Sequence, residues 1–206
     1  MFLAFAFQDE NSMNDLNDLD LVALIREGNE KAFECLFFKY HVELSRFAIS
    51  ITKSREFARD VVQDVFLKIW RNRENWEVNV GVRVYLFQSV KNQALNLLEK
   101  QNSQLRVISG FRSEMESLAL FGTPNPKSND GLTDVQRYSI KQIWAIVENM
   151  PERRRMVFEL NRRQGLSYKE IAKVLDITRK TVENHIANAL QDIRDQMLLK
   201  DIFEKN

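Results

Sequence analysis

The sequence predicts an all-α protein, and three observations lead to that prediction. Only three prolines and six glycines interrupt 206 residues, and residues that favour helices, such as Leu, Ala, Glu, Lys, Arg and Gln, dominate. Apolar residues recur at three- and four-residue intervals, whereas no run of alternating β-branched residues indicates a sheet. A stretch rich in Gly, Pro, Asn and Ser lies near the middle, so we expect two small helical domains joined by a flexible linker.

Composition and pattern divide the chain into four parts. We expect a disordered tail over 1–15, a first domain over 16–100, a linker over 101–135 and a second domain over 136–206. The tail opens with seven apolar residues, too few for a membrane span or a secretion signal, so we expect a cytoplasmic protein with no direct membrane insertion. Because Met13 precedes a more ordinary opening, we hypothesise that the first twelve residues are a start-codon artefact or a disordered tail.

Two helices open the first domain. The segment 16–27 is expected to be a short helix that Gly28 ends, because glycine is common just past the end of a helix. Asn29 is expected to cap the next helix. The segment 31–50 carries a wide apolar stripe that predicts a long core-facing helix. Cys35 is the only cysteine, which excludes a disulfide framework and a thiolate metal cage, and its apolar neighbours predict a buried, inert thiol.

A second pair of helices is separated by a loop. The segment 54–73 combines an apolar face with a charged outer face. The inward side chains are expected to be Phe57, Val61, Val65, Leu67 and Ile69. The segment 74–82 has no sustained period and predicts a loop. The segment 83–100 is helical again, and its outward side chains are uncharged and polar apart from Lys91, which suits nucleic acid and water equally.

The segment 165–194 predicts a helix-turn-helix. Ser167 and Glu170 have the spacing of a capping box, and Asp176 occupies the turn, where Asp tolerates left-handed backbone better than most residues. Thr178 is expected to cap the second helix. The buried side of that helix is expected to comprise Val182, Ile186, Ala189, Leu190 and Ile193.

The start of that second helix carries side chains suited to base edges and phosphates in a major groove. The candidates are Arg179, Lys180, Thr181, Asn184, His185 and Asn188. From 151 to 194 ten basic residues outnumber six acids, so this end of the chain would be drawn to phosphate, whereas the first 34 residues are acidic. An ordinary helical hairpin with a solvated polar face is the alternative interpretation.

The sequence offers no chemistry for an enzyme. It has no Ser/His/Asp or Cys/His set and no glycine loop that would cradle a phosphate. Its two histidines, His41 and His185, lie far apart with no neighbours at ligand spacing. We therefore expect no catalysis, no metal, no cofactor and no small-molecule substrate.

The chain also carries three motifs in a distinctive order. They are Asp60-Val-Val-Gln-Asp-Val-Phe-Leu-Lys-Ile-Trp70; Tyr85-Leu-Phe with Lys91-Asn-Gln-Ala94; and Met150-Pro-Glu-Arg-Arg-Arg-Met-Val-Phe-Glu-Leu160 followed by Gly165-Leu-Ser-Tyr-Lys-Glu-Ile-Ala172. At these separations, over about residues 16–196, they resemble bacterial sigma factors of the extracytoplasmic-function (ECF) group within the sigma-70 family. The short linker is similar to that of the ECF group.

The resemblance implies a two-domain helical subunit that binds core RNA polymerase, directs it to promoter DNA and is held by an anti-sigma factor. The domain over 16–100 would be sigma region 2 and the domain over 136–206 sigma region 4. The implied polymerase-docking residues are Asp60, Gln63, Asp64, Leu67 and Lys68. The residues implied to melt and read the −10 element are Trp76, Asn79, Lys91, Asn92 and Asn96. The six residues named above at the start of the second helix would read the −35 element.

Two features of the sequence favour other interpretations of its function. Val78, Val80 and Val82 in the −10 loop are apolar, which is unusual for a base-reading surface. The segment 166–185 also resembles the DNA-binding domain of LuxR-type regulators, although the receiver domain of such a regulator needs strands that 29–100 does not predict. A helical polymerase-binding adaptor without DNA contact is a further alternative, and salt-sensitive DNA binding would distinguish it.

Overall fold

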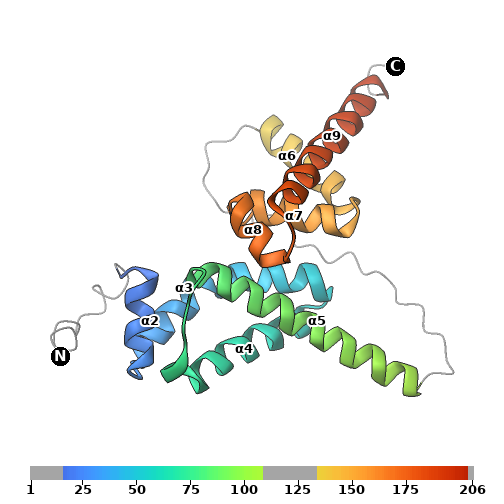
Figure 1. Ribbon diagram of the computed structural model, residues 1–206. Coiled ribbons are helices and arrows are strands. Elements are labelled where there is room, and N and C mark those ends of the chain that lie inside the picture. Colours follow the sequence, from blue (N-terminus) through green and yellow to red (C-terminus); the bar gives the residue numbers. More distant parts are fainter. Residues whose placement is uncertain (1–15, 109–133, 204–206) are drawn as a thin grey trace. The chain divides into compact units, whose positions relative to one another are not determined.

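The computed structural model describes residues 16–108 and 134–203, with side chains over 16–101 and 138–198. In these ranges the backbone forms eight α-helices, one short 3-10 helix and no strand (Figure 1). The chain divides into two compact units, Met1–Arg112 and Ser113–Asn206. The all-α prediction is therefore confirmed. The predicted tail over 1–15, with Met13, and the linker residues 109–133 lie outside the described residues.

The described part of the first unit contains four α-helices and the 3-10 helix. They are α2 (Asp18–Arg26), α3 (Glu30–Thr52), α4 (Arg55–Arg71), the 3-10 helix (Arg73–Asn75) and α5 (Val82–Ile108). Helices α3, α4 and α5 pack against one another, and α2 packs against α3. Their shared core includes the fully buried side chains of Leu21, Ile25, Leu36, Leu44, Val61, Leu86, Phe87 and Val90.

Helix ends in this unit follow from their capping residues. The Asn29 side chain accepts a 3.0 Å hydrogen bond from the backbone of Ala32, and Ser54 caps α4 in the same way. Gly28 has a φ of 88°, a left-handed conformation that ends α2 at little cost for glycine. The Asp18 carboxylate then joins α2 to α3, because it accepts hydrogen bonds from Lys39 and Tyr40 at 2.7 and 2.5 Å.

Three predictions for this unit are wrong. Leu67 is 48% exposed rather than inward, because the buried stripe of α4 passes through Val65, Phe66 and Ile69, and Leu67 lies on the opposite side of the helix. Cys35 is half-buried rather than buried, because it lies at the edge of the α3 stripe. Helix α5 continues to Ile108, eight residues into the predicted linker, because no glycine or proline precedes Gly110.

In its described residues the second unit is a bundle of four helices. They are α6 (Asp134–Glu148), α7 (Glu152–Arg162), α8 (Tyr168–Leu175) and α9 (Arg179–Phe203), and α9 packs against the other three. The core side chains include Ile146, Val147, Val157, Leu160, Leu166, Ile171, Val174, Val182, Ile186 and Ala189. The start of α9 is therefore held firmly from its inner side, which leaves its outer side free for other contacts.

Candidate nucleic-acid interface

The second unit holds a helix-turn-helix formed by α8 and α9. The Ser167 backbone N–H donates to Glu170 Oε2 at 2.8 Å, and the Glu170 backbone N–H donates to Ser167 Oγ at 3.3 Å, which completes the predicted capping box. Asp176 adopts the predicted left-handed conformation, with φ 55° and ψ 50°. Thr178 then caps α9 by accepting from the backbone N–H of Thr181 at 3.1 Å. These local bonds set where α9 begins.

The buried face of α9 is narrower than predicted. Val182, Ile186, Ala189 and Ile193 are buried, and their spacing of four, three and four residues defines one stripe. Leu190 is 41% exposed, so its predicted burial is wrong. It lies one position past the stripe, where none of the described helices of the unit covers it fully.

The six side chains predicted to read DNA all lie in the first ten residues of α9. Arg179, Lys180, Asn184 and Asn188 are exposed, whereas Thr181 and His185 are half-buried. Glu183 forms ion pairs with both cations of this group. Its carboxylate oxygens lie 3.1 Å from Arg179 Nε and 3.6 Å from Lys180 Nζ. A helix start with two cations is suited to phosphate.

His185 lies close to basic residues of α7. Partial burial, followed by the charges of Arg154 and Arg153, lowers the pKa of His185 from the ordinary 6.5. The imidazole is therefore neutral at pH 7 and offers one donor and one acceptor. Arg154 pairs with Asp192 of α9, which joins α7 to α9 on this side. The sequence prediction missed these arginines, although the run from Arg153 to Arg155 was a visible signal.

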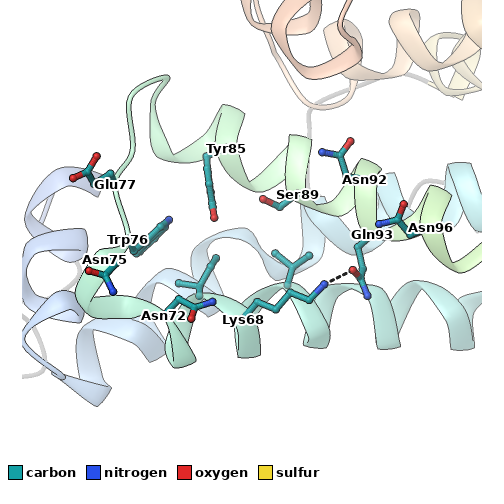
Figure 2. A pocket seen from close by; sticks show the side chains of 12 residues that line it. Lys68, Asn72, Asn75, Trp76, Glu77, Tyr85, Ser89, Asn92, Gln93 and Asn96 are labelled. Carbon is teal, nitrogen blue, oxygen red and sulfur yellow. Dashed lines mark hydrogen bonds between the residues drawn. The ribbon is translucent and has the colours of Figure 1, made fainter.

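The first unit contains a hollow of about 450 Å³ between α4, the 3-10 helix and α5 (Figure 2). Its lining is rich in amide side chains and contains two aromatic rings. The lining residues are Val65, Lys68, Ile69, Asn72, Asn75, Trp76, Glu77, Tyr85, Ser89, Asn92, Gln93 and Asn96. Its volume lies within the range of small-molecule sites, and a single base could enter it. We refer to it as the amide pocket.

The structure brings together three of the five residues predicted for the −10 element. Trp76, Asn92 and Asn96 line the amide pocket, whereas Asn79 lines a separate hollow beside α2 and Lys91 lines neither. Trp76 is only 4% exposed, and its ring lies 5.8 Å from that of Tyr85. The Trp76 indole N–H has no hydrogen-bond partner among the described residues. In this conformation Trp76 is a wall of the pocket and offers no open face for stacking.

Several pocket residues were missed by the sequence prediction. They are Asn72, Asn75, Tyr85, Ser89 and Gln93. Figure 2 shows Tyr85, Ser89, Asn92 and Asn96 succeeding one another along α5. Their spacing of four, three and four residues was a signal that they share one face of a helix.

The five predicted polymerase-docking residues lie together on the outer face of α4. Asp60, Gln63, Asp64, Leu67 and Lys68 are all exposed there. Two of them also contact α5, because Lys68 Nζ donates to Gln93 Oε1 at 2.5 Å and Gln93 Nε2 donates to Asp64 Oδ2 at 2.9 Å. The α4 face and the amide pocket therefore meet at Gln93.

The described parts of the chain contain neither a candidate metal site nor a candidate membrane-spanning helix. No group of three or more His, Cys, Asp or Glu side chains there could hold a metal ion. No helix in the same ranges is long and apolar enough to cross a bilayer.

Two helical units, one with a helix-turn-helix and the other with a polar pocket beside a charged helix face, define a DNA-binding regulator of the all-helical class. Comparison with known protein families identifies the family within this class. The family description "Sigma-70 region 2" matches residues 36–104, and "Sigma-70, region 4" matches residues 140–193. Together the two matches cover more than half of the chain, which therefore belongs to the sigma-70 family and has the role of a sigma factor.

Individual relatives agree with this assignment. The ECF RNA polymerase sigma-E factor of Escherichia coli K12 is 26% identical over 182 residues, which cover 88% of this chain and 95% of the relative. The sigma-E factor of Haemophilus influenzae is also 26% identical, over 190 residues, 88% of this chain and 96% of the relative. The expected resemblance to the ECF group is confirmed, and the match to region 2 excludes a LuxR-type regulator.

Two solved structures share the fold. CnrH, solved in complex with the cytosolic domain of CnrY, has a TM-score of 0.56 and 23% identity, over 87% of this chain and 96% of that chain. The sigma factor RpoE of Bartonella quintana, solved with the anti-sigma factor NepR, has a TM-score of 0.58 and 21% identity, over 82% of this chain and 98% of that chain.

Proposed function

We propose that this sigma factor binds core RNA polymerase through the outer face of α4 and directs it to promoters with two DNA-reading surfaces. The amide pocket reads the −10 element, and the start of α9 reads the −35 element. One observation carries the proposal: the outer face of α4 and the amide pocket adjoin at Gln93. The side chain of Gln93 bonds to Lys68 and Asp64 of that face and also lines the pocket, which is large enough for a single base. An adaptor without DNA contact would need neither the pocket nor the basic helix start.

The outer face of α4 has the composition of a protein-binding surface. Leu67 supplies an apolar centre that is 48% exposed, and charged or polar side chains surround it. An exposed apolar group rimmed by polar residues is typical of an interface. We therefore assign the docking role to Asp60, Gln63, Asp64, Leu67 and Lys68 as one surface.

The amide pocket suits a base extruded from an opened duplex. Flipped bases are recognised by hydrogen bonds to their edges and by stacking on aromatic rings. Amide side chains supply both donors and acceptors, and the Tyr85 ring supplies the aromatic surface. Asn92 and Asn96 contact the base, Trp76 supports the pocket from behind, and Asn79 and Lys91 contact the strand on either side.

The start of α9 suits a duplex major groove. Arg179 and Lys180 contact phosphate or guanine, while Asn184 and Asn188 present amides that pair with adenine edges. The hydroxyl groups of Thr181 and Thr178 are hydrogen-bonded to each other at 2.8 Å. We therefore assign Thr181 a contact with phosphate rather than with a base edge. Neutral His185 supplies one further hydrogen bond.

The proposal has three consequences for partners and place. The protein acts in the cytoplasm, where core polymerase and the chromosome are found. It does no catalysis of its own, because the polymerase supplies the chemistry. An anti-sigma factor holds it inactive, a role supported by the structural neighbour RpoE, which was solved with the anti-sigma factor NepR.

Binding of the full chain to purified core polymerase tests the docking surface. Leu67→Glu places a charge at the apolar centre and is expected to weaken binding at least tenfold. Leu95→Glu is the matched control, since Leu95 is 44% exposed on α5 away from the α4 face, and it should bind as the unmodified chain does. Equal affinities for the Leu67 variant and the unmodified chain would contradict the assignment of α4.

A further inference from the structure

The first unit contains a second hollow that is distinct from the amide pocket. It measures about 350 Å³ and lies between α2 and the loop that follows the 3-10 helix. Its lining residues are Leu19, Val22, Ala23, Arg26, Trp76, Glu77, Val78 and Asn79. We refer to it as the α2 groove. It shares Trp76 and Glu77 with the amide pocket, so the two hollows adjoin at this loop, one bounded by α2 and the other by α4 and α5.

Five of the eight side chains that line the α2 groove are apolar, whereas most of those that line the amide pocket are polar. Leu19 is 64% exposed, the largest exposure of any large apolar side chain among the described residues. Val78, which is unusual in a loop that contacts bases, lines the groove and so belongs to this apolar surface. Exposed apolar side chains around a concave surface indicate a binding site for an apolar segment.

The chain itself carries a segment of that kind close by. Residues 1–7 read Met-Phe-Leu-Ala-Phe-Ala-Phe and contain no polar side chain. Nine residues separate them from Asn17, the cap of α2, and an extended spacer of that length spans about 30 Å. Leu19 lies in the first turn of α2, so the groove is within reach. A short tether also gives the segment an effective concentration in the millimolar range, which favours it over a separate molecule.

Charge supports the same occupant. Asp9 and Glu10 follow the apolar segment after Gln8, and the exposed Arg26 lines the groove together with Glu77. Docked apolar side chains would therefore bring two acids towards a cation. We propose that residues 1–7 of this chain dock in the α2 groove and hold the loop over 76–81 from its α2 side.

This inference goes beyond the promoter-directing function and has a test that needs neither polymerase nor DNA. Phe5 is replaced by the photoreactive p-benzoylphenylalanine in the full chain, and cross-linked peptides are mapped by mass spectrometry. We expect cross-links within one chain to residues 19–26 or 76–79, with a yield independent of protein concentration. Leu19→Glu should lower that yield at least fivefold, and Leu95→Glu should leave it unchanged.

Three results would overturn the docking. These are cross-links elsewhere in the chain, cross-linked dimers that increase with concentration and indicate a second copy as the occupant, and a yield that Leu19→Glu does not lower. Hydrogen exchange checks the effect on the loop. In a chain that starts at Met13, the amides over 76–81 should exchange at least threefold faster than in the full chain, whereas those at the centre of α3 should not change. Equal rates in the loop would contradict its support by residues 1–7.

Discussion

The capping box of α8 gives a prediction whose size follows from the structure. Ser167→Ala removes the hydroxyl that accepts from the Glu170 backbone and donates to the Glu170 carboxylate at 2.7 Å. Loss of a Ser cap costs about 1 kcal/mol. Helix α8 has only eight residues, so few other local bonds can compensate. We therefore expect the opening free energy of α8 to fall by about 1 kcal/mol, which corresponds to about fivefold faster amide exchange.

Hydrogen-exchange mass spectrometry on the full chain measures this change directly in peptides that span α8. Lys169→Ala is the matched control, because Lys169 is an exposed neighbour on the same helix and alanine favours a helix at least as well. The control should exchange at the rate of the unmodified chain or slightly slower. Exchange in Ser167→Ala within twofold of the control would refute the role given to the cap.

Three further predictions concern charge and backbone. Glu183→Gln frees Arg179 and Lys180 from two exposed ion pairs of about 0.3–0.5 kcal/mol each, so holoenzyme should bind −35 duplex DNA about three- to fivefold more tightly; weaker binding would mean that Glu183 itself contacts a base. The lowered pKa of His185 means that the unfolded chain binds more protons below the ordinary 6.5. Stability of the second unit should therefore fall as pH decreases through that window, and an NMR titration of His185 with a midpoint at or above 6.5 would contradict this prediction. Gly28→Ala forces alanine to a φ of 88° and should destabilise the first unit by about 1–2 kcal/mol in a urea titration; an unchanged midpoint would show that the turn adapts.

Sequence reasoning predicted most of the fold because local signals set the helix ends. Asn29, Ser167 and Thr178 cap helices where expected, and Asp176 takes the left-handed conformation of the turn. Side-chain orientation was harder to predict where an apolar residue lies beside a buried stripe. Leu67 and Leu190 are exposed because none of the described helices covers that side, and only packing determines which sides are covered.

The candidate site was predicted less completely, because its parts come from different helices. The α9 residues share one helix start, so periodicity was enough to group them. The amide pocket joins the ends of α4 and α5, and its lining by Asn72 and Tyr85 depends on how those helices cross. The burial of Trp76 likewise depends on the fold of the loop over 76–81, which has no period that a sequence could display.

Run-off transcription tests the central claim most directly. Purified core RNA polymerase is supplied with genomic promoter fragments, with and without this protein. The account predicts specific transcripts only when the protein is present, with start sites that share one −10 and one −35 element. Leu67→Glu should reduce these transcripts at least tenfold, in line with its weaker binding to core polymerase. Core polymerase that gains no specific transcript, despite forming a complex with the protein, would contradict the promoter-directing role and favour an adaptor without DNA contact.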